Sequence, residues 1–393
     1  MSGDRQPDPD PYPNLAWLRA NAPVSRTEKG TAAAPIYFVT PFELVRSGLS
    51  DSRLTADPRK VADISPEQIS FDRGLLDTDP PDHGRMRQVL HHAFAPSGVL
   101  KLRPMITKIC RRAIHAFETR GHADLMAEYA QVVPVEIVHE ILGVPPEVRV
   151  PAPELMDWYW RAGLSRQPDD DAMDQIDDYV RRILDHKRDH RGADLTTIML
   201  DALARGDLHD EAELRGTLSA VLGPGHITTV PMLATGIVRL LERPAVLAAA
   251  RGEPSRWADV VEEVLRYDSV VQVTNNRYAE AELTIGGVEV PKGSIVLMSL
   301  AAANRDPSRF DHPDTFDVDR RRRGHVAFGH GPHVCLGARL GRVEGEIAFA
   351  TLFEALPSLR LACPPEEVVW TWGPTERGPA TVPVTFAPRE GEA

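Results

Sequence analysis

The sequence predicts a mainly α-helical fold with small peripheral β-sheets. Two stretches, residues 96–187 and roughly 210–267, carry the apolar periodicity of helices and fill most of the middle of the chain. Strand-like segments are short and lie at residues 36–40, 283–297 and 382–386. Because strands and helices do not alternate along the chain, a parallel sheet built from strand–helix–strand units is not expected.

The strand assignments rest on side-chain type and turn signals. Residues 36–40 read Ile-Tyr-Phe-Val-Thr, and β-branched and aromatic side chains favour strands. Within 283–297, the Gly286-Gly287 pair between apolar residues is typical of a tight hairpin turn. Residues 382–386 repeat the alternating apolar pattern close to the end of the sequence.

The helix assignments rest on periodicity and its interruptions. Proline-rich joints at residues 144–146 and 150–153 divide the first helical stretch, because proline stops a helix. A further helix is predicted over residues 336–352, directly after a turn-rich loop.

Composition narrows the class of protein. The 393 residues are 42% hydrophobic and 26% charged, which is typical of a soluble globular protein. The formal net charge of −12 argues against a nucleic-acid binder or a basic membrane-surface protein. No C-x-x-C pair, apolar leader or apolar run of about 18 residues is found, so we expect a cytoplasmic protein without disulfides or a membrane span. Since no linker stands out, we expect a polar N-terminal segment over residues 1–22 and a single domain over 23–393.

One cysteine stands in a glycine-rich loop that runs into a predicted helix. Residues 328–340 read FGHGPHVCLGARL, which places Cys335 at a helix N-terminus. Free backbone N–H groups and the positive end of the helix dipole favour an anionic sulfur there, and a thiolate is a good ligand for iron. Gly331 and Gly337 let the backbone come close to the sulfur and to a flat cofactor. The alternative is a buried structural thiol.

The spacing of this loop resembles the haem-binding loop of the cytochrome P450 family. The pattern F-x-x-G-x-x-x-C-x-G is met by Phe328, Gly331, Cys335 and Gly337. The resemblance extends from about Pro23 onward and is greatest to the soluble bacterial members. It implies one mostly helical domain that binds haem b (iron protoporphyrin IX), with Cys335 as the axial ligand of the iron.

Basic side chains elsewhere match the family's propionate-binding positions. His83 and Arg87 follow Asp82, the predicted cap of a helix, and lie four residues apart on one helix face. Two donors on one face suit a carboxylate, although an isolated pair of this kind is more often a solvated polar face. The resemblance implies that His83, Arg87, Arg277 and His333 hold the haem propionates.

A second matching set is an E-x-x-R motif with a later arginine. Glu263 and Arg266 are three residues apart on a predicted helix and can form an ion pair. In the resembled family this pair forms a buried network with a third residue, here Arg320. The resemblance implies a structural role for the three, not a catalytic one.

The segment over residues 221–229 resembles the family's oxygen-activating A-G-x-D/E-T-T motif, with two departures. Gly225 and Thr228 match; the resemblance places Gly225 beside the haem and makes Thr228 the residue that hydrogen-bonds the oxygen ligand. Pro224 replaces the alanine and Ile227 replaces the acid.

These departures predict a distorted helix and an unusual proton supply. Pro224 and Pro231 in one helix predict a pronounced kink. Because Ile227 cannot supply protons, the remaining sources are His226, the substrate and ordered water. For His226 itself, a position that faces away from the pocket is favoured.

The resemblance implies an O₂- and electron-dependent monooxygenase that hydroxylates a small hydrophobic molecule in secondary metabolism. Ferredoxin and ferredoxin reductase are the expected electron donors, and a basic run at residues 320–323 is a candidate docking site for the ferredoxin. The aromatic side chains at residues 158–160 and at Trp370 and Trp372 favour an aromatic or polycyclic substrate. One alternative is radical coupling, ring formation or desaturation without oxygen insertion, suggested by Ile227. A second alternative is a haem-binding protein without catalytic activity.

Overall fold

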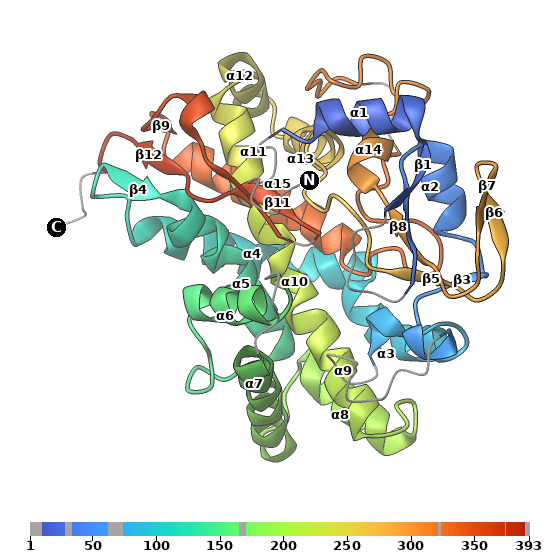
Figure 1. Ribbon diagram of the computed structural model, residues 1–393. Coiled ribbons are helices and arrows are strands. Elements are labelled where there is room, and N and C mark those ends of the chain that lie inside the picture. Colours follow the sequence, from blue (N-terminus) through green and yellow to red (C-terminus); the bar gives the residue numbers. More distant parts are fainter. Residues whose placement is uncertain are drawn as a thin grey trace. The chain divides into compact units, whose positions relative to one another are not determined.

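The computed structural model describes residues 10–27, 34–61, 74–164, 170–320, 324–373 and 375–389. These residues are mostly helical with small sheets, which confirms the predicted fold class (Figure 1). The chain divides into two compact units. The first comprises Met1–Ile69, Glu262–Cys335 and Val369–Gly378, and the second comprises Ser70–Val261, Leu336–Val368 and Pro379–Ala393. The prediction of a single domain over residues 23–393 stays a prediction.

The first unit contains a five-stranded sheet in the order β1-β2-β8-β5-β3. Strand β2 (Ile36–Val39), predicted from its side chains, pairs antiparallel with β1 (Val24–Thr27) and parallel with β8 (Ile295–Met298). Strand β5 (Arg277–Ala279) lies antiparallel to β8 on its other side and to β3 (Leu54–Thr55) at the edge. The sheet therefore joins segments that are distant in sequence.

Two hairpins complete the strands of this unit. Strands β6 (Leu283–Ile285) and β7 (Val288–Val290) are joined by Gly286 and Gly287, whose φ angles of 55° and 83° require the left-handed conformation. The predicted hairpin is thus confirmed. Strands β10 (Trp370–Trp372) and β11 (Arg377–Pro379) form a second pair. Of these two strands, the sequence indicated only β10, through the alternation of Trp370 and Trp372.

The first unit also contains short helices, and one of them lies in the predicted polar N-terminal segment over residues 1–22. Helix α1 spans Tyr12–Asn21, and its Tyr12 hydroxyl donates a hydrogen bond of 2.5 Å to the backbone oxygen of Asp268. The Arg19 guanidinium donates to the backbone oxygen of Ala302 at 2.8 Å. Residues 12–21 are therefore an ordered part of the first unit, together with the short helices α2 (Phe42–Gly48), η1 (Pro58–Lys60) and α14 (Leu300–Asn304).

The second unit is built from helices, and both predicted helical stretches are confirmed. A proline-rich joint separates α5 from α6, as expected. The main helices of this unit are α3 (Asp82–Phe94), α4 (Pro96–His115), α5 (Val132–Leu142), α6 (Ala152–Tyr159), α7 (Asp170–Asp189), α8 (Leu195–Arg205), α9 (Glu211–Leu222), α10 (Pro224–Ile227), α11 (Thr229–Leu241), α12 (Pro244–Gly252) and α15 (Ala338–Ala355). Helix α13 (Arg256–Tyr267) begins in this unit and ends in the first.

Short elements join these helices. Strand β12 (Pro383–Thr385), predicted from its alternation, lies between β4 (His122–Asp124) and β9 (Arg360–Leu361). The short helical turns of the unit are η3 (Leu75–Asp77), η4 (Met126–Ala130), η5 (Trp160–Leu164) and η6 (Pro365–Glu367).

The central helix of the second unit is long and apolar. The run Glu211–Leu241, which comprises α9, α10 and α11, passes a length and hydropathy criterion for a membrane span. Of its most apolar window, 72% is buried inside the protein, as in the core helix of a soluble protein. Polar residues interrupt this run, so the sequence contains no uninterrupted apolar stretch long enough to predict a membrane span.

Candidate functional site

The loop that carries Cys335 is shaped by two glycines in the left-handed region. Gly329 and Gly331 have φ angles of 72° and 75°. A Cβ on Gly331 would lie 2.4 Å from the backbone oxygen of Leu49, so no other residue fits there. The Cys335 N–H donates to the backbone oxygen of Phe328 at 2.9 Å, which closes the loop behind the thiol.

The cysteine precedes α15 as predicted. Helix α15 begins at Ala338 with Gly337 as its N-cap residue, two positions later than expected from the sequence. The thiol of Cys335 is free of any disulfide. The loop therefore places a cysteine outside any disulfide three residues before a helix of 18 residues.

The first unit also holds two of the predicted propionate-binding residues. Arg277 begins β5 and is buried, with its guanidinium donating to the backbone oxygen of Asn276 at 3.1 Å. His333 is half-buried and lies in the same loop as Cys335. A soft thiol and basic side chains in one unit match the two kinds of group that a haem needs, an iron ligand and partners for its carboxylates.

His83 and Arg87 lie one turn apart on α3, as the sequence predicts. His83 is 3% exposed and Arg87 is half-buried. The prediction that Asp82 caps this helix is wrong: Pro81 holds the cap position and Asp82 is the first helical residue. Asp82 instead accepts a hydrogen bond from Arg85 at 3.0 Å, because its side chain already lies within the first turn.

The structure brings Glu263, Arg266 and Arg320 together. Arg266 donates two parallel hydrogen bonds of 2.8 and 2.7 Å to the carboxylate of Glu263. Arg320 approaches the same carboxylate at 3.5 Å. The side chains of Arg266 and Glu263 are 2% and 4% exposed, so the pair is desolvated and joined in bidentate geometry. Residues 321–323 of the basic run lie outside the described residues.

The predicted distortion of the central helix is confirmed. Regular α-helix stops at Leu222, resumes for the four residues of α10 and stops again at Thr228 before α11. Pro224 has no N–H to donate, and the N–H groups of His226 and Ile227 both donate to the oxygen of Gly223. Figure 1 shows the three pieces in succession through the second unit.

Thr228 and Gly225 lie within this break. The Thr228 hydroxyl donates to the backbone oxygen of Pro224 at 3.2 Å, so it replaces part of the lost backbone bonding. A Cβ on Gly225 would lie 2.9 Å from the Val138 side chain of α5. The close approach of α5 is therefore one sufficient reason for glycine at position 225.

His226 is buried and is bonded to the helix that carries it. Its Nδ1 atom lies 2.6 Å from the backbone oxygen of Leu222, and the centres of its ring and the Tyr159 ring lie 5.2 Å apart in an edge-to-face arrangement. Burial lowers the pKa of His226 to about 4, so the imidazole is neutral near pH 7. The sequence showed a histidine two residues after a proline but not that its ring folds back onto the preceding turn.

The three adjacent aromatic residues at 158–160 differ in burial, because successive side chains on a helix point in different directions. Trp158 and Tyr159 are buried, whereas Trp160 is 40% exposed. Trp370 and Trp372 are half-buried on one face of β10, and the Arg377 guanidinium lies 4.0 Å from the Trp370 ring centre and 5.8 Å from that of Trp372. Two of the three clustered aromatics thus face inward.

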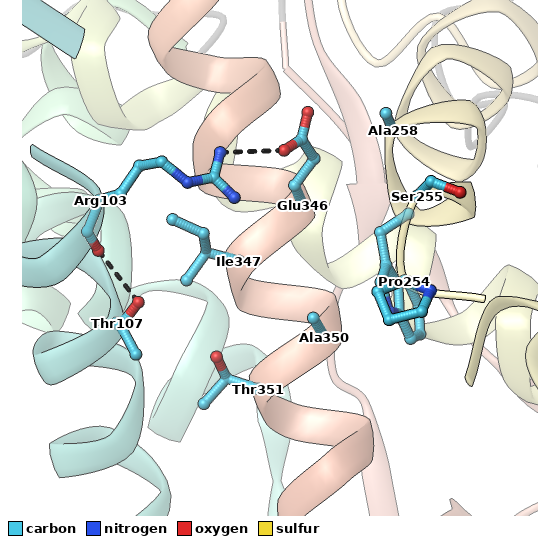
Figure 2. A pocket seen from close by; sticks show the side chains of 10 residues that line it. Arg103, Thr107, Pro254, Ser255, Ala258, Glu346, Ile347, Ala350 and Thr351 are labelled. Carbon is cyan, nitrogen blue, oxygen red and sulfur yellow. Dashed lines mark hydrogen bonds and ion pairs between the residues drawn. The ribbon is translucent and has the colours of Figure 1, made fainter. Parts of the chain in front are cut away.

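A groove of about 530 Å³ opens elsewhere on the second unit (Figure 2). Helices α4, α13 and α15 line it, and an ion pair of 3.1 Å joins Arg103 of α4 to Glu346 of α15. None of the predicted site residues lines this groove. It is therefore separate from the residues that the sequence singled out.

Comparison with known proteins assigns the family. Residues 158–368 match the family model described as cytochrome P450. The chain is 34% identical to cytochrome P450 monooxygenase PikC of Streptomyces venezuelae over 96% of this chain and 91% of that protein.

Solved structures agree. A myxobacterial cytochrome P450, CYP267B1, in complex with myristic acid, superimposes with a TM-score of 0.90 at 33% identity, covering 96% of this chain and 97% of that one. The enzyme CxnD, described as forming a C–S bond in chuangxinmycin biosynthesis, gives 0.89 at 32% identity, with 97% and 96% covered. The chain therefore belongs to the cytochrome P450 family and is a haem-thiolate oxidoreductase of the monooxygenase type.

Proposed function

We propose that Cys335 is the thiolate ligand of a haem b and that this chain hydroxylates a small hydrophobic molecule of secondary metabolism. The observation that carries the proposal is the loop of Cys335, in which Gly331 packs against the Leu49 backbone and the Phe328 carbonyl holds the cysteine backbone. Such a loop fixes the sulfur while leaving it free of other covalent bonds. The haem, when bound, supplies the oxidising chemistry with dioxygen and two electrons.

The other predicted site residues have two proposed roles. Some balance the charge of the haem carboxylates, and others stabilise the unit that carries Cys335. Buried His83 and Arg277, with Arg87 and His333, offer cationic or hydrogen-bonding partners for carboxylates. Phe328 and Gly337 flank the ligand loop on either side of the cysteine. The buried Glu263–Arg266 pair, with Arg320, stiffens the unit that carries the cysteine.

Thr228 is the proposed catalytic partner on the central helix. Its hydroxyl is bonded to the Pro224 carbonyl and lies in the break, where backbone groups are only partly paired. A hydroxyl held in this way can turn its proton toward a new acceptor at small cost. Position 227 carries isoleucine, so protons must reach the break from water or from substrate.

We propose the substrate and the redox partners of this chain by their chemical class. Cytochromes P450 take small-molecule substrates and redox partners. PikC is named a monooxygenase, which supports oxygen insertion here, and the half-buried Trp370 and Trp372 favour an aromatic or polycyclic substrate. We propose a ferredoxin with its reductase as the electron donor and the cytoplasm as the location.

The first test is spectroscopic. The purified protein, reduced and exposed to carbon monoxide, should show the red-shifted Soret band of a thiolate-ligated haem, and Cys335→Ala should abolish it. Cys363→Ala is the matched control, since that half-buried cysteine is likewise outside any disulfide but lies outside the loop. A thiolate-type band that survives in Cys335→Ala would refute the assignment.

A second candidate function is oxidative coupling without oxygen insertion. Two observations favour it: Ile227 in the position of the acid, and similarity to CxnD, which is described as forming a C–S bond. Turnover under ¹⁸O₂ separates the two candidates. Label in the product supports hydroxylation, whereas an unlabelled product supports coupling.

A further inference from the structure

The break in the central helix is held by a side chain of its own. In a regular helix the Leu222 carbonyl would accept from the N–H of residue 226, but that N–H donates to Gly223. The His226 ring takes its place, with Nδ1 at 2.6 Å from the Leu222 oxygen. Because a carbonyl oxygen only accepts, Nδ1 must carry the proton.

The other nitrogen of His226 is therefore an acceptor. The ring is neutral near pH 7, so Nε2 has a lone pair and no proton. His226 is 0% exposed, and its Nε2 has no hydrogen-bond partner among the described residues. An unpaired buried acceptor of this kind costs free energy unless a partner is supplied. This bonding also excludes His226 as a direct proton conduit, since its donor faces a carbonyl.

A second buried imidazole offers the complementary group. His139 on α5 is 0% exposed, and its Nε2 lies 2.9 Å from the Tyr179 hydroxyl. That hydroxyl accepts from the Val150 N–H at 3.4 Å, so its own proton is available to His139 Nε2. His139 is neutral because burial lowers its pKa to about 3. Its Nδ1 then carries a proton, and that atom has no partner within the described part of the chain.

A third unpaired group completes the cluster. The Tyr159 hydroxyl on α6 is buried without a hydrogen-bond partner in the described ranges. Its ring lies against His226, and a Cβ on Gly223 would be 3.2 Å from its oxygen, so the hydroxyl lies at the break itself. His139 and His226 are close enough to interact electrostatically, and Gly225 lets α10 come against Val138 of α5.

One donor, one acceptor and one hydroxyl, each buried without a partner among the described residues, thus lie on neighbouring helices of the second unit. We propose that His139, Tyr159 and His226 hold a buried water molecule between α5, α6 and α10, and that this water anchors the bent segment from Gly223 to Thr228. The water accepts from His139 Nδ1, donates to His226 Nε2 and bonds the Tyr159 hydroxyl. Buried waters typically make about three hydrogen bonds, which this set supplies.

His226 acts in this arrangement as a positioning residue for Thr228. It ties the break to the preceding turn through Nδ1 and to α5 and α6 through the water. The consequence for turnover rests on the proposed function, whereas the water itself does not.

The primary test is a high-resolution crystal structure of the holoenzyme. We expect an ordered water within about 2.7–3.2 Å of His139 Nδ1, Tyr159 Oη and His226 Nε2. A direct Tyr159–His226 hydrogen bond without water would overturn the proposal, and so would a dry cavity.

Two substitutions of His226 separate its two bonds. His226→Asn keeps an amide near the position of Nδ1 and removes Nε2, so the Leu222 carbonyl stays capped while the water is lost. His226→Gln places its amide near Nε2, so the water stays while the cap is lost. Crystal structures of both variants should show these opposite losses. Retention of the water in His226→Asn would contradict the assignment.

A matched tyrosine pair links the site to turnover. Tyr159→Phe should lose the water and lower the product formed per reductant consumed, because Thr228 is less well held. Tyr129→Phe is the control, since that buried hydroxyl already donates directly to the Ala348 carbonyl at 2.7 Å. An equal fall in both variants would overturn the positioning role. A missing thiolate band in the wild-type protein would refute the proposed function instead, and leave the water observable.

Discussion

At the scale of single residues, the first unit contains a buried ion pair whose donors are all hydrogen-bonded. Arg266 donates two hydrogen bonds to Glu263 and three more to backbone oxygens of Asn304, Pro313 and Thr315. All five guanidinium hydrogens are therefore used. A buried ion of this kind is tolerated because every donor has a partner.

Removal of the Glu263 carboxylate should therefore strongly lower the free energy of unfolding. Glu263→Ala leaves the 2%-exposed Arg266 without its counter-charge, and we expect the free energy of unfolding to fall by about 3–5 kcal/mol. Urea-induced unfolding measures this loss. Asp177→Ala is the control, because its pair with Arg181 is largely exposed and should contribute about 0.3–0.5 kcal/mol. Similar losses in both variants would contradict the buried-pair argument.

The isoleucine at position 227 gives a second prediction at this scale. Ile227→Glu introduces an acid beside Thr228, which should raise the ratio of product to electrons consumed if proton supply limits the wild-type enzyme. Ile227→Gln has the same shape without the acid and should not. The ratio is measured from reductant oxidation and product yield. No gain with glutamate would show that the missing acid is not limiting.

At the scale of elements, the break between α9 and α11 is the distinctive feature. Pro224→Ala restores an N–H for the preceding turn, so we expect a more continuous helix and a free energy of unfolding higher by up to about 3 kcal/mol. Pro231→Ala is the control: Pro231 lies in the first turn of α11, after the break that begins at Pro224. Chemical denaturation and a crystal structure measure both effects. Equal stabilisation by the two changes would contradict the explanation of the break.

The sequence predicts that the central helix is distorted, but it does not show which groups stabilise the distortion. The two prolines were enough to predict a distortion, and the structure places the break at Pro224, which has no N–H, whereas Pro231 lies in the first turn of α11. What the break does with its unpaired carbonyls depends on neighbours: the His226 ring, the Thr228 hydroxyl and the approach of α5 at Gly225. The pairing of Glu263, Arg266 and Arg320 was predictable only through family resemblance, since an isolated i, i+3 pair is common on exposed helices.

At the scale of the whole molecule, buried titratable groups give opposite pH dependences. Burial lowers the pKa of His139 to about 3 and that of His226 to about 4, from an ordinary 6.5. Below about pH 6.5 the unfolded chain binds these protons and the folded one does not, so the free energy of unfolding falls as the pH falls.

Glu344 has the opposite effect. Burial raises its pKa from 4.5 to about 8, so the folded protein keeps a proton that the unfolded chain loses, and stability falls as the pH rises between these values. Two histidines outweigh one carboxyl below about pH 6.5, and the carboxyl dominates above it. These three groups together predict maximal stability near pH 6.5.

The alkaline limb provides the test. Glu344→Gln should flatten the decline of the free energy of unfolding between about pH 6.5 and 8, because an amide does not ionise. Glu346→Gln, two residues along α15 in a partly exposed ion pair, should leave the decline in place. Denaturation at a series of pH values measures both. An unchanged decline in Glu344→Gln would refute the assignment.

The order of the five-stranded sheet was beyond sequence reasoning. The strand at residues 36–39 was predicted from its own side chains, but its parallel partner β8 lies in a different part of the sequence. Local patterns identify such strands without specifying which edges meet, because register depends on packing of the finished core.

That parallel pairing has a consequence for biosynthesis. Ile36 of β2 pairs with Ile295 of β8, so about 260 residues must leave the ribosome before the strand meets its partner. At roughly 5–20 residues per second, the delay is on the order of 13 to 50 seconds. During this interval the β1–β2 hairpin presents an unpaired edge, a surface that other nascent chains can join. Slower translation through the middle of the message should therefore lower the soluble yield, and a chaperone that covers extended segments should restore it.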